Sequence, residues 1–303
     1  MVRFQWFWCL VLLVSSLAEG AVRMDVVSAA HQAGASVGVG SRVALQFDDQ
    51  ATPRRALFLG DLVAANGRAE QRMLLDLDRK KVLILDRSEV LAPRARYQKI
   101  VRPYDQVDGT CTGYAMDHMM EQIARNRLSG NDTLQAQFAS EKGRTQFLVR
   151  AINDYYISTV HRTSIHGILK TYGKEFGLNC GLRKFKDSAR AMAHVAEQVL
   201  AGTPVLVSFD IGPNMFEADL PLVALSGTKT SRLDGRLWLP RKIGERNSGG
   251  HSVVAVAAFE ALGKKRLLML DSDWAEPRIW DLEQALGGRT DIETVEFHSC
   301  HEN

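Results

Sequence analysis

The residues best suited to chemistry in this chain are Cys111, His251 and Asp271, which occur in that order. A cysteine attacks a carbonyl carbon as the thiolate, and a helix N-terminus or a neighbouring imidazolium favours that charged form. A carboxylate beside the imidazole holds the ring so that its other nitrogen can take the thiol proton. This order of nucleophile, base and orienting residue predicts a cysteine hydrolase.

The segment that follows Cys111 has the periodicity of a helix. Its apolar residues recur at spacings of three and four, at Ala115, Met116, Met119, Met120 and Ile123. Gly109 gives the backbone room to turn into this segment. The pattern predicts a helix that begins close to the thiol. Considered alone, a free cysteine is more often a buried small hydrophobic residue, so the case for a nucleophile depends on its partners.

His251 and Asp271 flank two apolar runs, residues 252–259 and 267–270, which have the length of strands. The intervening residues 261–265 include Gly263 and form a turn, so the pair predicts an antiparallel hairpin. Both residues are about equally far from a turn centre near Ala261 and Leu262, and we expect their side chains to face each other. Either residue alone would be interpreted as a polar group at a strand end, but their joint placement favours catalysis.

Four segments in this order match one known pattern. They are Gln106 with Gly109-Thr-Cys-Thr-Gly-Tyr-Ala115, then Gly202-Thr-Pro-Val-Leu-Val-Ser208, Gly250-His-Ser-Val-Val-Ala-Val256 and Leu270-Asp-Ser-Asp-Trp274. Together they resemble the papain-like cysteine peptidases over roughly residues 103–280. The resemblance implies that Cys111 is the nucleophile, His251 the general base and acid, and Asp271 the orienting residue. It also implies that Gln106 donates to the oxyanion beside the backbone N–H of Cys111.

The resemblance implies an α+β fold over residues 99–303, in which a helical subdomain carries Cys111 and a β-rich subdomain carries His251 and Asp271. Residues 189–200 have an amphipathic helical pattern, and a strand is expected at 205–209. Before this part, residues 21–98 contain short apolar runs at 42–47, 56–59, 73–77 and 81–85, which predict a β-rich region. This region could be an inhibitory segment, a binding module or an integral subdomain.

The predicted reaction is hydrolysis of peptide or amide bonds in a peptide or protein substrate, through a thioester on Cys111. An alternative with the same residues is acyl transfer of the transglutaminase kind, in which an amine replaces water. A second alternative, from another class, is an inactive binding module on the same fold. The sequence predicts no cofactor.

Composition and the first residues agree with a globular enzyme outside the cytoplasm. The chain has 303 residues, of which 46% are hydrophobic, and a net charge of only +3 with scattered Lys and Arg. The sequence has no basic stripe with interleaved aromatic residues, so it does not predict a nucleic-acid partner. Residues 1–20 combine Arg3, an apolar run and small residues near Gly20, which indicates a secretory signal peptide and a mature chain without a membrane span.

The cysteines support the same compartment. Cys9 lies in the predicted signal peptide, which leaves Cys111, Cys180 and Cys300. An odd number in an oxidising compartment leaves one thiol free if the other two pair, so we predict a Cys180–Cys300 disulfide and a free Cys111. A rival interpretation takes His298, Cys300 and His301 as metal ligands, although the prediction is that no metal is bound.

Overall fold

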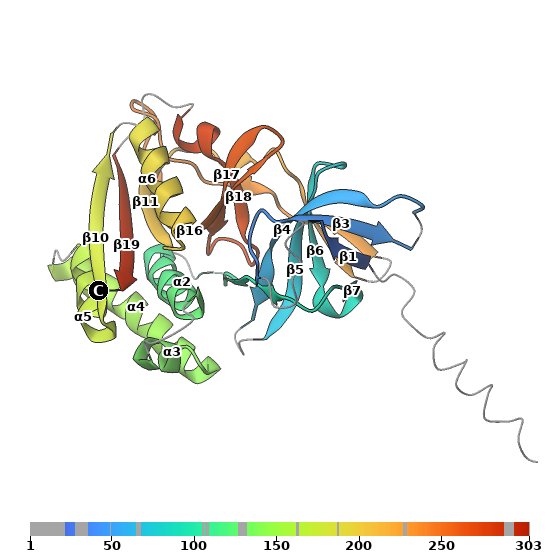
Figure 1. The fold of residues 1–303 in the computed structure, drawn as a ribbon. Coiled ribbons are helices and arrows are strands. Elements are labelled where there is room, and N and C mark those ends of the chain that lie inside the picture. Colours follow the sequence, from blue (N-terminus) through green and yellow to red (C-terminus); the bar gives the residue numbers. More distant parts are fainter. Residues whose placement is uncertain are drawn as a thin grey trace, which may run out of the picture.

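The protein is a mixed α+β molecule, as the sequence predicts. A computed structural model describes residues 22–27, 36–48, 50–64, 68–104, 106, 109–126, 132–161, 164–186, 188–226, 229–287 and 294–302. The predicted signal peptide lies outside these residues. Two large sheets lie side by side, and the helices pack around the second of them (Figure 1).

The first sheet is built mainly from the N-terminal region. Its strand order is β14-β13-β6-β5-β4-β3-β1-β7, and β9 pairs with β4. The four predicted apolar runs all lie in it, in β3 to β6, which confirms the predicted β-rich region. The strands are β1 (Val22–Val26), β3 (Arg42–Phe47), β4 (Arg54–Val63), β5 (Ala69–Asp76), β6 (Lys81–Asp86), β7 (Val90–Leu91), β9 (Lys99–Val101), β13 (Leu222–Ser226) and β14 (Lys229–Arg232).

Two strands of the first sheet come from the distant segment after residue 220. Leu222 to Leu225 of β13 pair in parallel with Val82 to Leu85 of β6, and β14 then pairs with β13. One hydrophobic cluster includes Leu59 of β4 together with Met116 of α2 (Cys111–Asn126) and Leu268 of the second sheet. The N-terminal sheet therefore shares both strands and core with the rest of the molecule.

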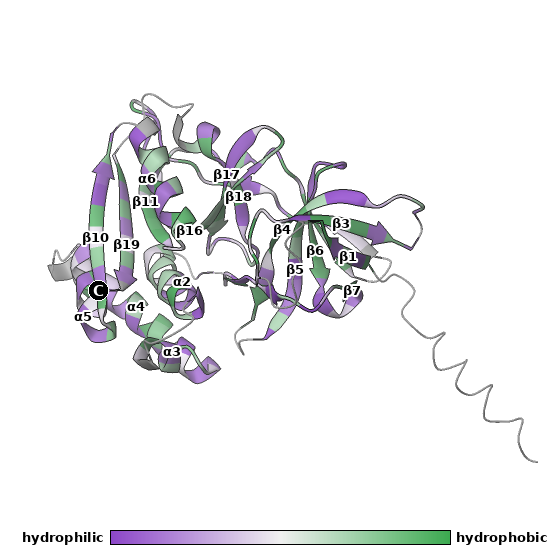
Figure 2. Cartoon of the chain, in the orientation of Figure 1, coloured by the Kyte–Doolittle hydropathy of each residue, from purple (hydrophilic) through white to green (hydrophobic). Residues whose placement is uncertain are grey.

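The second sheet has the strand order β10-β19-β11-β16-β17-β18. Alternation along its central strands divides the core, because Val207 and Val253 face one hydrophobic cluster while Leu206 and Val254 face the other. Figure 2 shows this apolar interior between the helices and the strands. The strands are β10 (Leu178–Phe185), β11 (Val205–Ile211), β16 (Gly249–Ala261), β17 (Lys264–Leu270), β18 (Arg278–Asp281) and β19 (Val295–Glu302).

Helices cover both faces of the second sheet. The amphipathic α6 (Ser188–Leu200) packs its Ala191 and Val195 on one face, as the sequence predicts. On the other face, α2 is buried from Cys111 to Ala124. Three further helices pack on this side of the molecule, namely α3 (Asp132–Gln137), α4 (Glu141–His161) and α5 (Ile165–Phe176) (Figure 1).

The remaining described elements are short. The glycine-rich segment 212–250 contains four short strands, and two of them complete the first sheet as β13 and β14. The others pair with each other, so this segment is held at two places. The small elements are β2 (Ser36–Val37) with β8 (Arg96–Tyr97), β12 (Phe216–Glu217) with β15 (Arg236–Leu237), the 3₁₀ turn η1 (Arg87–Glu89) and the π-helical turn η2 (Glu283–Gly287).

Candidate active site

Cys111 is the first residue of α2, where the sequence places it. Gly109 has a φ of 75°, a left-handed conformation that glycine adopts at little cost, and it lets the chain turn into the helix. The thiol is free and nearly buried, and its Sγ lies 3.9 Å from the carbonyl oxygen of Gly250. The helix N-terminus therefore meets the start of β16, next to His251.

The hairpin of β16 and β17 brings His251 and Asp271 together. Nε2 of His251 lies 3.0 Å from Oδ1 of Asp271, and both side chains are buried. The turn residues are Leu262 and Gly263, both with positive φ, one position beyond the expected centre. A bulge between Ala255 and Ala257 offsets this difference, so that the two side chains stay on one face of the hairpin.

The environment of the imidazole favours its charged form. Burial alone lowers the pKa of His251, but the negative charge of Asp271 and the hydrogen bonds to Asp271 and Cys111 raise that pKa well above its usual value. Because Nε2 is engaged by Asp271, Nδ1 is the ring nitrogen that remains for the thiol. Phe209 packs edge-on against the ring, with centroids 5.8 Å apart. A buried imidazolium between a carboxylate and a thiol is the arrangement that a thiolate nucleophile needs.

Gln106 lies against the segment that follows Asp271. Its backbone N–H donates to the carbonyl of Ser272 at 2.8 Å, and its Oε1 accepts from the Ser272 hydroxyl at 2.9 Å. Its Nε2 donates to Oδ1 of Asp273. The residue is thus held at three points, two of them on its side-chain amide, and one N–H of the NH₂ group is used by Asp273.

Asp273 is a residue whose part in the site the sequence did not assign. Besides accepting from Gln106, it accepts from the indole Nε1 of Trp238 at 2.7 Å, and its own backbone N–H donates to Oδ1 of Asp271 at 3.0 Å. It therefore links Asp271 to Gln106. The only sequence signal was its position two residues after Asp271.

A polar cleft of about 270 Å³ opens beside His251. Its floor carries three hydroxyl groups in contact, since Oγ of Ser252 lies 3.0 Å from Thr112 Oγ1 and 2.9 Å from Ser208 Oγ. Two carboxylates, Asp210 and Glu296, also line it. Sequence reasoning missed these residues because they come from α2, β11, β16 and β19, which only the fold brings together.

A second group of buried polar side chains lies along α2 behind the site. Glu121 accepts from Arg125 and Arg144, whereas both oxygens of Asp117 and both ring nitrogens of His118 are buried without a hydrogen bond to the described residues. Burial lowers the pKa of His118 to about 3, assisted by the charge of Arg144 and opposed by that of Asp271. His118 is therefore neutral at physiological pH, which distinguishes it from His251.

The structure contains the predicted disulfide between Cys180 and Cys300. It joins β10 to β19, where these residues are register partners. Cys300 therefore does not offer a thiolate to the rival metal site with His298 and His301. Among the described residues, His251, Asp271 and Asp273 have potential ligand atoms within 4.8 Å of one another, but these atoms are engaged in the hydrogen bonds given above.

A comparison with known protein families gives no match, and a search of curated proteins finds no similar sequence. Among the described residues, no helix is long and apolar enough to cross a membrane.

Proposed function

We propose that this protein is a cysteine peptidase with a papain-like arrangement, in which a helical part carries Cys111 and a β-rich part carries His251 and Asp271. The observation that carries the proposal is the buried His251, which contacts the free Cys111 thiol and the Asp271 carboxylate at once. Cysteine hydrolases require this triple contact, whereas a structural cysteine needs neither partner.

The geometry suggests one assignment of steps. The Cys111 thiolate attacks the substrate carbonyl, and His251, then an imidazolium, protonates the leaving amine through Nδ1. Water, deprotonated by the same nitrogen, hydrolyses the thioester and releases the acid. The backbone N–H of Cys111 and the second N–H of the Gln106 side chain are the proposed donors to the oxyanion.

The substrate is proposed to be a peptide or protein that enters the polar cleft beside His251. Hydroxyl groups and two carboxylates line this cleft beside His251, so side chains bound there are proposed to be polar. Together with the disulfide, the signal-like residues 1–20 support a proposed location outside the cytoplasm.

The test of this proposal is a comparison of the wild type with Cys111→Ala. A peptide library incubated with each protein and analysed by mass spectrometry should contain new carboxyl termini only with the wild type. Mild alkylation should modify Cys111 and abolish that cleavage, because Cys180 and Cys300 are paired. Cleavage that survives in Cys111→Ala would refute the proposal.

The two alternatives predict different products in the same assay. If amide products form in the presence of an added primary amine while little free acid appears, the protein is an acyl transferase. If Cys111 resists alkylation in the folded protein and no peptide is cleaved, the inactive binding module is the better description.

A further inference from the structure

A basic groove lies away from the candidate active site, between the N-terminal sheet and the end of α2. It has a volume of about 1070 Å³ and reaches Asn126 at one end and Ser36 at the other. Its charged lining comprises one carboxylate, Asp61, and the cations Arg68, Arg87, Arg96, Lys99 and Arg125. We refer to it as the arginine groove. The cations look scattered in the sequence, and the fold gathers them on one surface.

The single carboxylate does not neutralise the arginine groove. Asp61 is buried and accepts from the buried Arg72 at 2.7 and 3.1 Å, while Arg87 approaches it only to 3.6 Å and keeps half of its side chain exposed. Arg96 and Lys99 are exposed and make no ion pair with any residue that the structure describes. Arg125 is paired with Glu121. The positive charge of Arg87, Arg96 and Lys99 is thus directed to solvent.

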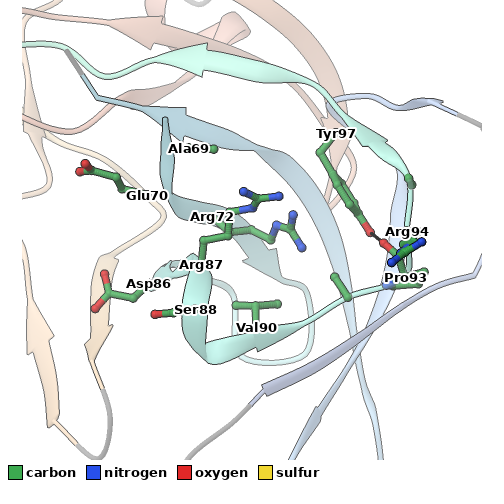
Figure 3. Close-up of a pocket in the computed structure, with 12 residues that line it drawn as sticks. Ala69, Glu70, Arg72, Asp86, Arg87, Ser88, Val90, Pro93, Arg94 and Tyr97 are labelled. Carbon is green, nitrogen blue, oxygen red and sulfur yellow. Dashed lines mark hydrogen bonds between the residues drawn. The ribbon is translucent and has the colours of Figure 1, made fainter. Parts of the chain in front are cut away.

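An adjoining pocket of about 700 Å³ continues the arginine groove through Arg87 and Tyr97. Figure 3 shows the guanidinium groups of Arg72 and Arg87 near its middle, with Arg94 and Tyr97 on one side and the carboxylates of Glu70 and Asp86 on the other. The phenol of Tyr97 donates to the carbonyl of Pro93 at 2.8 Å. This bond closes the turn that carries Arg94, and Arg96 follows in β8, which pairs with β2.

The chemistry of the lining selects among anionic partners. Single-stranded nucleic acids bind largely through aromatic rings whose faces are free for stacking. Among the described residues, Tyr97 is the only aromatic one in this lining, and its ring is in contact with Arg72, 4.0 Å above its centroid, and with Phe58 at 5.4 Å. Guanidinium groups pair bidentately with carboxylates and phosphates without any stacking, and the carboxylates of Asp and Glu are the groups of this kind that a polypeptide carries.

We propose that the arginine groove binds an acidic segment of another polypeptide, rich in Asp and Glu. Binding there needs neither Cys111 nor His251, so the site does not depend on the proposed peptidase activity.

The test measures binding of a fluorescent glutamate decamer to the full chain that carries Cys111→Ala. Fluorescence anisotropy at low ionic strength reports the binding. The double variant Arg96→Glu, Lys99→Glu should bind about tenfold more weakly, since two attractions become repulsions. The matched control is Lys174→Glu, Lys265→Glu, which changes the net charge equally at exposed positions elsewhere. It should bind within about twofold of the parent. Circular dichroism should show the same fold in all three.

Three results would overturn the proposal. The first is no binding of the decamer by the parent protein. The second is an equal loss in both double variants, which would mean that only net charge matters. The third is tighter binding of an oligothymidine or a sulfated glycan of equal length than of the decamer, if that binding is lost in the variant Arg96→Glu, Lys99→Glu. Such a result would assign the groove to another macromolecule.

Discussion

At the residue scale, two buried histidines in and behind the candidate site have opposite pKa shifts. His251 has a carboxylate and a thiol as partners, and its pKa is raised, whereas His118 on the same helix as Cys111 has no hydrogen bond to the described residues, and its pKa falls to about 3. Burial lowers the pKa of both imidazole rings. The charge of Asp271 beside His251 decides the difference, because it lies in direct contact at 3.0 Å.

His251 and Asp271 are expected to contribute unequally to catalysis. His251→Ala removes the proton donor and acceptor and should lower kcat by about 10²–10⁴-fold. Asp271→Asn should cost far less, because an amide oxygen still accepts the Nε2 proton and orients the ring. Asp271→Ala should fall between the two. Steady-state kinetics on folded variants will measure this order, and Asp271→Asn as inactive as His251→Ala would show that Asp271 has another function.

Gln106 is expected to act on the transition state. Gln106→Ala removes a proposed oxyanion donor and should lower kcat by about 10²-fold with little change in KM. Asp273→Asn is the comparison, because its single amide oxygen still accepts from one of the two donors, Gln106 or Trp238, and the variant should be milder. The kinetic constants of both variants decide the assignment. Full activity in Gln106→Ala would remove this residue from the proposed mechanism.

At the scale of elements, β19 is the strand that joins β10 to the rest of the second sheet. It pairs with both β10 and β11, and its Cys300 is joined to Cys180 across 120 residues of sequence. Reduction, or the double variant Cys180→Ala, Cys300→Ala, should lower the free energy of unfolding by about 2–5 kcal/mol, because the unfolded chain regains its loop entropy. Urea unfolding with and without reductant measures this, and an unchanged midpoint would contradict it.

The same strand carries a pH-dependent contribution to stability. Burial lowers the pKa of His298 to about 4, below the value of about 6.5 in an unfolded chain. As the pH falls below about 6.5 the unfolded state takes up the proton first. The stabilisation is therefore complete above that pH and is lost as the pH falls towards 4.

The corresponding variant is His298→Gln. Between pH 6 and 4.5, its free energy of unfolding should fall less steeply with decreasing pH than that of the wild type. The two slopes should differ by about 1.4 kcal/mol per pH unit. Urea titrations at several pH values test this difference. Equal slopes in the two proteins would show that His298 does not remain neutral in the folded state.

At the scale of the whole molecule, the N-terminal sheet and the part that carries the candidate site share one core. Leu57, Leu62, Met73 and Ile84 of the first sheet belong to the same hydrophobic cluster as the buried methionines of α2. Each such side chain contributes about 1.5–3 kcal/mol when buried, so the four together are comparable to the usual net stability of a domain, about 5–15 kcal/mol.

Removal of residues 1–98 is therefore expected to prevent folding. It deletes the partner of β13 and exposes the apolar surface of α2. A chain without residues 1–20 is the control and should fold normally. Circular dichroism and thermal unfolding of both chains test this, and a truncated chain that is soluble, cooperative in unfolding and reactive at Cys111 would show that the N-terminal region is dispensable.

Local sequence determined much of this protein. The period of the apolar residues after Cys111 placed the start of α2, the apolar runs placed β3 to β6, and the two runs around Gly263 placed the hairpin with His251 and Asp271, because each of these signals lies within about twenty residues. Three cysteines follow the predicted signal peptide, and because the chemistry predicted for Cys111 requires a free thiol, the sequence was enough to pair Cys180 with Cys300. Tertiary structure alone decided what depends on distant segments. Four features depend on contacts between residues of different elements, and such contacts leave no periodic pattern in the sequence. They are the pairing of β13 with β6, the hydroxyl-lined cleft, the hydrogen bonds of Asp273 with Gln106 and Trp238, and the grouping of Arg87, Arg96 and Lys99 beside α2.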